Sequence, residues 1–197
     1  MGGSIQSVTP TLGPTVGVAV TCEIDCSTPG NQADMEPFLQ QLEQMHAMEE
    51  PVVWIVKAIG SRPDHECIMG DGMAKMLYTA GSVGTVTNGG VRDVDGLLSV
   101  PYAVYSKGTV IHHTAIRFGK MNQPVEIGGI TVSPGEVIHA NKEGVIKIPA
   151  GCLDILTEKA IAMRAMEHES HIGNRRSDLE PREAMRRTQA KFKEYGF

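Results

Sequence analysis

The sequence predicts a mixed α/β domain followed by helices. Two observations carry this prediction. Short β-branched runs alternate with helically spaced segments as far as residue 106, and glycine-separated strands and then two longer helical segments follow. The chain has 197 residues, enough for one domain with a short appendage. We expect an α/β domain over residues 1–172 and a helical extension over residues 173–197.

The first half of the chain is expected to alternate strands with helices. Residues 33–47 place Phe38, Leu42 and Met45 on one helical face. Residues 51–59 form a short apolar run that is typical of a buried strand. By the same criteria, strands are expected at 15–26, 82–87 and 101–106, and helices at 73–80 and from Val91 onward.

The second half is expected to form short strands and then two helices. Residues 109–117 alternate weakly, which favours a strand. Strands joined by glycine turns are expected at 124–132, 136–140 and 144–148. The last segments have helical spacing and are expected as helices at 154–171, with a stop signal at Gly173, and at 181–195, opened by Pro181.

Composition and charge exclude several classes of protein. The formal net charge is −5 and the pI is about 5.8, whereas nucleic-acid-binding domains are normally basic, so no nucleic-acid partner is expected. An apolar run long enough for a membrane span is missing. The first residues lack the basic and apolar regions of a secretory signal. The four cysteines are therefore expected to be reduced thiols, and the protein to be cytoplasmic.

The first candidate for chemistry is the turn Gly70-Asp71-Gly72-Met73, between a predicted strand and a predicted helix. Backbone N–H groups at a helix start are unpaired and lie at the positive end of the dipole, so they can bind a carboxylate or phosphate. The turn lacks the third glycine of a dinucleotide-binding fingerprint and the Gly-Lys-Ser/Thr of a phosphate-binding loop. The same residues also fit an ordinary tight turn.

The second candidate is the pair Arg92-Asp93, which two glycines place directly after a predicted strand. Loops at strand ends commonly hold functional groups. Arginine offers a planar fork for carboxylates, and aspartate is a hard oxygen ligand suited to Mg²⁺. The alternative is a helix capped by aspartate beside a solvated arginine.

Other histidine and serine patterns do not predict a site. His168 and His171 are three residues apart, whereas a zincin helix needs two histidines four residues apart. His112 and His113 are neighbours in a predicted strand, so their rings would point to opposite faces. The Gly-x-Ser-x-Gly pattern of α/β-hydrolases is missing.

Taken together, the segments resemble the RraA-like family, and within it the metal-dependent branch of 4-hydroxy-4-methyl-2-oxoglutarate aldolases, which also decarboxylate oxaloacetate. The central match is Gly70-Asp71 followed, after twenty residues, by Arg92-Asp93. Its flanks are the segments 81–97, 101–109 and 124–149, and the likeness covers roughly residues 16–165.

This resemblance implies a swivelling-type β/β/α domain with mixed central sheets and C-terminal helices, assembled as a homotrimer or homohexamer. It also implies a class II type aldolase or 2-oxo acid decarboxylase. Such a lyase cleaves a C–C bond of a 2-oxo mono- or dicarboxylic acid and releases pyruvate through a stabilised enolate.

The resemblance further implies a role for each motif residue. The turn 70–73 would bind the substrate carboxylate through backbone donors, and Arg92 would contact its oxo or carboxylate oxygens. Asp93 would ligate Mg²⁺ or Mn²⁺, and Asp71 would orient a metal-bound water that returns a proton to the substrate.

The chain departs from the family pattern in several places, and alternatives therefore remain open. Gly96 stands where members often carry an acid, and the segment 139–143 differs from the usual sequence. The alternatives are a non-catalytic, protein-binding regulator like the members that inhibit RNase E, or a related lyase or hydrolase with another carboxylate substrate.

Overall fold

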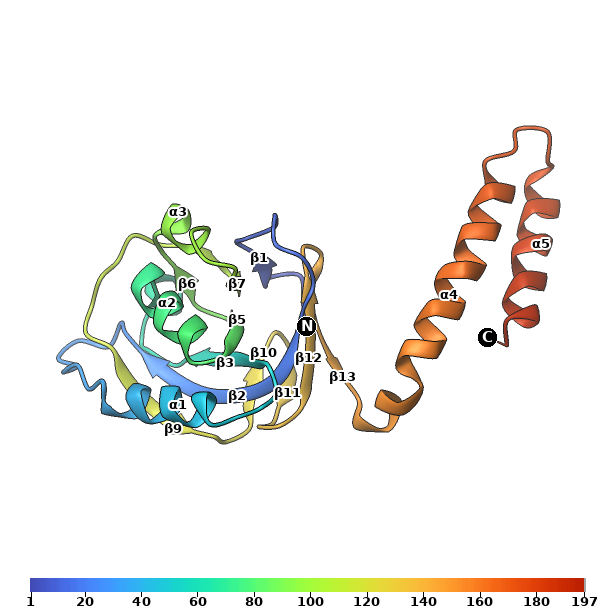
Figure 1. Ribbon diagram of the computed structural model, residues 1–197. Helices are drawn as coiled ribbons and strands as arrows, with labels where there is room; N and C mark the ends of the chain where they lie inside the picture. Colours follow the sequence, from blue (N-terminus) through green and yellow to red (C-terminus); the bar gives the residue numbers. More distant parts are fainter. Residues whose placement is uncertain (197) are drawn as a thin grey trace. The chain divides into compact units, whose positions relative to one another are not determined.

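The computed structural model describes residues 1–196 and divides the chain into two compact units (Figure 1). They are Met1–Pro149 and Ala150–Phe197. The expected boundary between residues 172 and 173 falls inside helix α4 (Leu153–Asn174), which belongs to the second unit. Within residues 1–196, we find no helix that combines the length and apolarity needed to cross a membrane.

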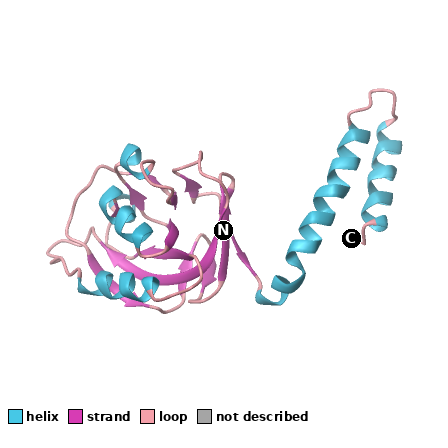
Figure 2. Ribbon diagram, viewed as in Figure 1, coloured by secondary structure: helices cyan, strands magenta, loops and turns pink. Residues whose placement is uncertain are grey.

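A mixed eight-stranded sheet forms the frame of the first unit (Figure 2). Its strands are β1 (Gln6–Ser7), β2 (Thr15–Asp25), β3 (Val52–Ala58), β5 (Ser82–Thr87), β7 (Ala103–Ser106), β9 (Arg117–Met121), β12 (Val137–Asn141) and β13 (Gly144–Ile148). The order is β1-β7-β5-β3-β2-β12-β13, with β9 paired to the end of β2. The four strands from β7 to β2 are parallel, and the others pair antiparallel.

The two ends of this sheet approach each other. The amino group of Met1, which precedes β1, donates a hydrogen bond to the carbonyl oxygen of Val145 in β13, at 2.7 Å. The amide of Gly2 donates to the carbonyl oxygen of Gly128, also at 2.7 Å. The sheet therefore curls toward a barrel, and its two edges are linked by the first residues of the chain.

Smaller elements cover the sheet and build one end of the unit. A three-stranded parallel sheet contains β4 (Cys67–Met69), β6 (Gly90–Val91) and β8 (Gly108–Thr109). A hairpin joins β10 (Val125–Ile127) to β11 (Ile130–Val132). The helices of the unit are α1 (Glu36–His46), α2 (Asp71–Thr79) and α3 (Val94–Leu97), with a 3₁₀ turn at Pro63–His65.

The core lies on both faces of the large sheet. Successive side chains of β3 alternate between two apolar clusters, because side chains of a strand point to opposite faces. Trp54 packs with Phe38 of α1 and Leu77 of α2, whereas Ile55 packs with Ile127 of the β10–β11 hairpin. Burial on both faces explains why the sequence of β3 is a continuous apolar run.

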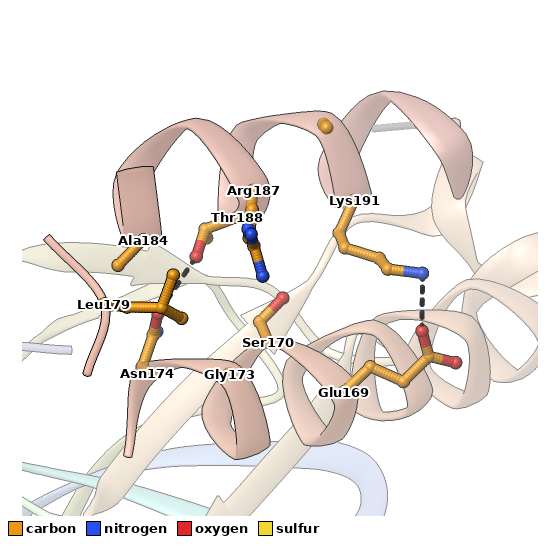
Figure 3. A pocket seen from close by; sticks show the side chains of 10 residues that line it. Glu169, Ser170, Gly173, Asn174, Leu179, Ala184, Arg187, Thr188 and Lys191 are labelled. Atoms are coloured by element: carbon orange, nitrogen blue, oxygen red, sulfur yellow. Dashed lines mark hydrogen bonds and ion pairs between the residues drawn. The ribbon is translucent and has the colours of Figure 1, made fainter. Parts of the chain in front are cut away.

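The second unit is a helical hairpin of α4 and α5 (Pro181–Glu194). Lys191 lies 2.7 Å from a carboxylate oxygen of Glu169, and the Tyr195 hydroxyl donates to the same carboxylate at 2.7 Å. Figure 3 shows the pocket of about 270 Å³ between the two helices, with Ser170 on its α4 side. Its lining is mostly apolar, as expected for an incompletely filled helix–helix contact.

The structure confirms the predicted mixed α/β class with C-terminal helices, and it corrects two local predictions. Val91 belongs to strand β6, and helix α3 begins only at Val94. Residues 110–116 form a loop without strand pairing, so His112 and His113 do not lie in a strand. Their rings are therefore not constrained to opposite faces of a sheet.

Candidate functional site

Three loops of the first unit meet at one edge of the small parallel sheet. Because β4, β6 and β8 are parallel, their carboxyl ends lie at the same edge. Strand β4 leads into Gly70, β6 into Arg92, and β8 into Val110. The fold therefore brings together the two motifs that the sequence separates by twenty residues.

Helix α2 begins at this edge with backbone N–H groups that precede its first helical hydrogen bond. Gly70 is its N-cap, and the N–H of Ala74 donates to the Gly70 carbonyl oxygen at 3.2 Å. The amides of Asp71, Gly72 and Met73 precede that bond and have no backbone acceptor within the helix, and the Gly72 amide is hydrogen-bonded to the Asp71 carboxylate. The Met73 side chain packs against the core, so only its backbone can serve the site. The helix start can thus bind an anion.

The Arg92 side chain is held by the strands and the loop around it. Its backbone N–H donates to the Met69 carbonyl oxygen at 3.1 Å. Its Nη1 atom lies 3.5 Å from the Cys67 sulfur and 3.3 Å from the His112 carbonyl oxygen. The side chain is 22% exposed. Since a guanidinium carries several N–H donors in a fixed fork, donors remain for a ligand.

Asp93 follows in the left-handed backbone region, with φ 60° and ψ 46°. Aspartate adopts this conformation more readily than most residues, and such outliers cluster at functional sites. Its Oδ2 atom lies 3.1 Å from Arg92 Nε. A methyl group on Gly70 would collide with the same oxygen. The absence of a side chain at residue 70 therefore leaves room for the Asp93 carboxylate beside the start of α2.

Asp71 supplies a second carboxylate. Its Oδ2 atom lies 2.5 Å from the ammonium of Lys75, one helical turn further along α2. The hydrogen bond from Lys75 lowers the pKa of Asp71, and the charge of Lys75, the hydrogen bond from the Gly72 amide and the charge of Arg92 add to this effect. A methyl group on Gly96 of α3 would lie 2.6 Å from Asp71 Oδ2. Asp71 therefore stays ionised near neutral pH, with α3 packed closely against it.

An open pocket of about 290 Å³ lies beside Arg92 and Asp93. Its other lining residues are Val94, Thr109, Val110 and Ile111. This volume is near the lower end of the range of about 300–1,000 Å³ that small-molecule sites occupy. A small organic acid would fit it. The pocket of Figure 3 lies in the second unit and contains neither motif.

The residues at this edge fit a hydrated divalent cation. Mg²⁺ is usually held in proteins by one or two carboxylates and several waters. Asp71 and Asp93 supply such hard oxygen donors, and both side chains are partly exposed. Among residues 1–196, no group of three or more His, Cys, Asp or Glu side chains is arranged to hold a metal ion. A divalent ion bound here would therefore keep most of its water.

Three partners of the site were not predicted from the sequence. Lys75 could have been found, because residues four apart on a helix face each other and Asp71 stands four residues earlier. Cys67 and His112 contact Arg92 only because folding brings β4 and the loop 110–116 together. Local sequence patterns carry no signal for such contacts.

The His112 ring has a contact that the sequence did not indicate. It packs edge-on against the ring of His65, with the ring centroids 5.2 Å apart. Its Nδ1 atom is buried and has no hydrogen-bond partner in the part of the chain that the structure describes. The His112 side chain thus packs against His65, while the His112 carbonyl oxygen accepts a hydrogen bond from Arg92.

With this geometry in place, comparison with known families identifies the chain. The model of the RraA-like family, described as Aldolase/RraA, matches residues 2–147. This match includes both motifs and most of the chain. The protein therefore belongs to the RraA-like family of aldolase-type domains.

Individual relatives are distant. A protein of Halalkalibacterium halodurans with the provisional name 4-hydroxy-4-methyl-2-oxoglutarate aldolase is 30% identical over 121 residues, which are 60% of this chain and 58% of that protein. Across four curated relatives, the chain spans between 17% and 65% of their lengths.

Solved structures confirm the fold. An uncharacterised protein from Pseudomonas syringae pv. tomato superposes with a TM-score of 0.70 at 22% identity, covering 93% of this chain and 81% of that one. The RNA-processing inhibitor RraA from Thermus thermophilis gives a TM-score of 0.58 at 20% identity, covering 76% and 84%. At these identities the likeness concerns the fold alone.

Proposed function

We propose that the protein is a divalent-metal-dependent lyase that cleaves a C–C bond of a 2-oxo mono- or dicarboxylic acid and releases pyruvate. The observation that supports this proposal most directly is the meeting of the α2 start with Arg92 and Asp93 at one sheet edge. A helix start suited to an anion, a cationic fork and a hard oxygen donor thus lie close together. These are the groups that stabilisation of an enolate requires.

Each group has a task in this reaction. The amides of the turn 70–73 bind the carboxylate next to the oxo group, which fixes the substrate for bond cleavage. When the C3–C4 bond breaks, C4 leaves as CO₂ from oxaloacetate, or as a carbonyl product once its hydroxyl proton has passed to the water near Asp71. The electron pair of the bond moves toward the oxo oxygen, and Arg92 donates hydrogen bonds to that developing charge. Mg²⁺ or Mn²⁺ bound by Asp93 would supply Lewis-acid stabilisation of the same charge.

The product needs a proton at C3. Asp71 is ionised, because Lys75 lowers its pKa, and it lies at the start of α2. It can therefore accept a hydrogen bond from a water and hold that water near the substrate. The hydrogen bond from Lys75 holds the carboxylate in place.

A coupled pyruvate assay tests the proposal. Oxaloacetate and 4-hydroxy-2-oxo acids are offered with Mg²⁺ or with EDTA, to the wild-type chain and to Asp93→Ala. We expect metal-dependent pyruvate release from at least one substrate, and none with EDTA or with Asp93→Ala. Asp95→Ala is the matched control, because it removes a nearby exposed carboxylate and should keep full activity.

Two results would contradict the proposal. One is the absence of metal-dependent pyruvate from every substrate offered. The other is retained activity in Asp93→Ala, which would show that the metal is not held there. A chain that releases no pyruvate but binds a protein partner in EDTA would instead be a non-catalytic regulator.

We also propose that the active form is a homotrimer or homohexamer, as the family resemblance implies. Light scattering of the full chain should then give three or six times the protomer mass of 21.2 kDa. A monomeric mass would contradict this part of the proposal.

A further inference from the structure

Glu66 is a buried carboxyl group to which the proposed reaction assigns no task. It stands directly before β4 and is 0% exposed. Burying a carboxyl group is costly unless hydrogen-bond donors surround it. A methyl group on Gly60 would collide with its Oε1 atom, so the surrounding chain fits closely around the carboxyl group.

Donors from the two residues that follow β2 bind this carboxyl group. The Cys26 amide donates to Oε2 at 3.0 Å, and the Cys26 sulfur lies 2.9 Å from the same oxygen. The single thiol proton is shared between this oxygen and the Cys67 carbonyl oxygen, which lies 3.1 Å from the sulfur. The Ser27 hydroxyl donates to Oε1 at 2.5 Å. Burial and the adjacent Glu66 raise the pKa of the Cys26 thiol, so the thiol keeps the proton that it donates. Glu66 therefore ties the residues after β2 to the start of β4.

Cys26 is also bonded to the loop 110–116. The Thr114 hydroxyl donates to the Cys26 carbonyl oxygen at 2.5 Å. The same loop carries His112, whose carbonyl oxygen accepts a hydrogen bond from Arg92 Nη1 at 3.3 Å. Only one residue separates Thr114 from His112. The hydrogen bond between Thr114 and Cys26 therefore helps to fix the His112 carbonyl oxygen, which accepts from Arg92.

A second connection runs through β4. Glu66 is followed directly by Cys67, whose sulfur accepts a hydrogen bond from the same Arg92 Nη1 atom at 3.5 Å. The Glu66 carbonyl oxygen accepts a hydrogen bond from the Gly90 amide at 2.8 Å, which joins β4 to the strand that leads into Arg92. Both acceptors of Arg92 Nη1 therefore stand on segments that are bonded to Glu66 or to Cys26.

We propose that Glu66, together with Cys26 and Thr114, positions the Arg92 guanidinium for binding of the substrate. Glu66 is thus a positioning residue that acts through Cys67 and His112 and does not touch the ligand. The ligand in this inference rests on the proposed function. The placement of Arg92, however, can be measured in the free protein.

Two variants test this role. Thr114→Val removes the hydroxyl group at an exposed position and keeps the side-chain shape. Glu66→Gln keeps the side-chain shape but leaves one carbonyl acceptor where a carboxyl group received three hydrogen bonds. Thr131→Val is the matched control, since Thr131 is an exposed threonine on β11. The position of Arg92 is followed by the ¹H–¹⁵N resonance of its Nε–Hε group, assigned by its loss in Arg92→Lys.

Ligand binding is measured with oxalate in Mg²⁺ buffer by calorimetry, and metal binding with Mn²⁺ by electron paramagnetic resonance. We expect Thr114→Val to shift the Arg92 resonance and to weaken oxalate binding about five- to tenfold, as loss of one hydrogen-bonded link predicts. Its Tm and Mn²⁺ affinity should match those of Thr131→Val. Glu66→Gln should shift the same resonance and also lower the Tm.

The inference is overturned if folded Thr114→Val keeps the wild-type resonance and oxalate affinity. A lower Tm without either change would show a merely structural role and would also overturn it. Should Glu66→Gln fail to fold, Thr114→Val decides. If wild-type protein neither binds oxalate nor releases pyruvate, the proposed function fails, and the Arg92 resonance in the two variants still decides the positioning role.

Discussion

The guanidinium of Arg92 and the carboxylate of Asp93 lie 3.1 Å apart at the carboxyl end of β6. The left-handed backbone of Asp93 permits this contact between neighbouring residues. A cation bound alone at Asp93 would be repelled by Arg92, and an anion bound alone at Arg92 would be repelled by Asp93. The pair therefore favours joint binding of a cation and an anion.

Oxalate should accordingly tighten Mn²⁺ binding. We expect the Kd for Mn²⁺ to fall about tenfold at saturating oxalate, with the reciprocal effect of Mn²⁺ on oxalate. Titrations followed by electron paramagnetic resonance measure the first effect, and calorimetry measures the second. Chloride at the same ionic strength is the control. If the Kd for Mn²⁺ is the same with and without oxalate, Arg92 and Asp93 belong to separate sites.

Gly70→Ala should disable the site with little loss of stability. Its methyl group would collide with Asp93 Oδ2 and lie 3.0 Å from Arg92 Nε, so the pair must move. We expect pyruvate release to fall at least about tenfold, as displacement of catalytic groups by about 1 Å commonly costs more than this. Gly13→Ala is the control, because a methyl group there meets no atom within 4 Å. Equal activity of the two variants would contradict the assigned geometry.

Most of the large sheet could be predicted from the sequence, because all its strands except β1 and β9 show a clear pattern in the predicted segments. Strand β3 has seven residues buried largely on both faces, and it reads as an apolar run. Strands β4, β6 and β8 have two or three residues each, too few for any periodicity, and none was predicted with these bounds. Yet these short strands bring the two motifs together.

The candidate site was predicted only as far as its motifs are local. Glycines before a helix and an Arg-Asp pair after a strand indicate an anion cradle and an oxygen donor. The groups that hold Arg92, the Cys67 sulfur and the His112 carbonyl oxygen, come from other segments. His112 was even assigned to a strand, because weak alternation in an exposed loop imitates the period of a strand.

The four cysteines should differ sharply in reactivity. Cys22, Cys26 and Cys67 are buried, and burial is the main cause that raises the pKa of each thiol. Cys152 is partly exposed. Because thiolates are the reactive species, we expect one thiol to react quickly with Ellman's reagent in the native protein and all four after unfolding. Cys152→Ser should abolish the fast reaction; a fast reaction that persists would show that a buried thiol is accessible.

Asp25 should make folding stability depend on acid pH. The carboxylate is 2% exposed, and burial alone would raise its pKa. Hydrogen bonds from the Thr28 amide at 3.0 Å and from Arg117 at 3.0 Å outweigh this effect and hold the pKa well below its usual value. A lowered pKa in the folded state gives stability that is present above the unfolded pKa of about 3.9. That stability is lost as the pH falls from there toward the folded pKa.

Urea unfolding between pH 3 and pH 7 measures this contribution. We expect Asp25→Asn to lose about 1–3 kcal/mol at pH 7, because the neutral amide replaces a charge-assisted acceptor. The difference in unfolding free energy between the variant and the wild type should shrink as the pH falls below about 4, because the stability that ionised Asp25 contributes is lost there. Asp95→Asn is the control, because this carboxylate is exposed and should change stability by less than about 0.5 kcal/mol. A loss in Asp25→Asn that stays constant down to pH 3 would show that shape, and not the charge of Asp25, stabilises the end of β2.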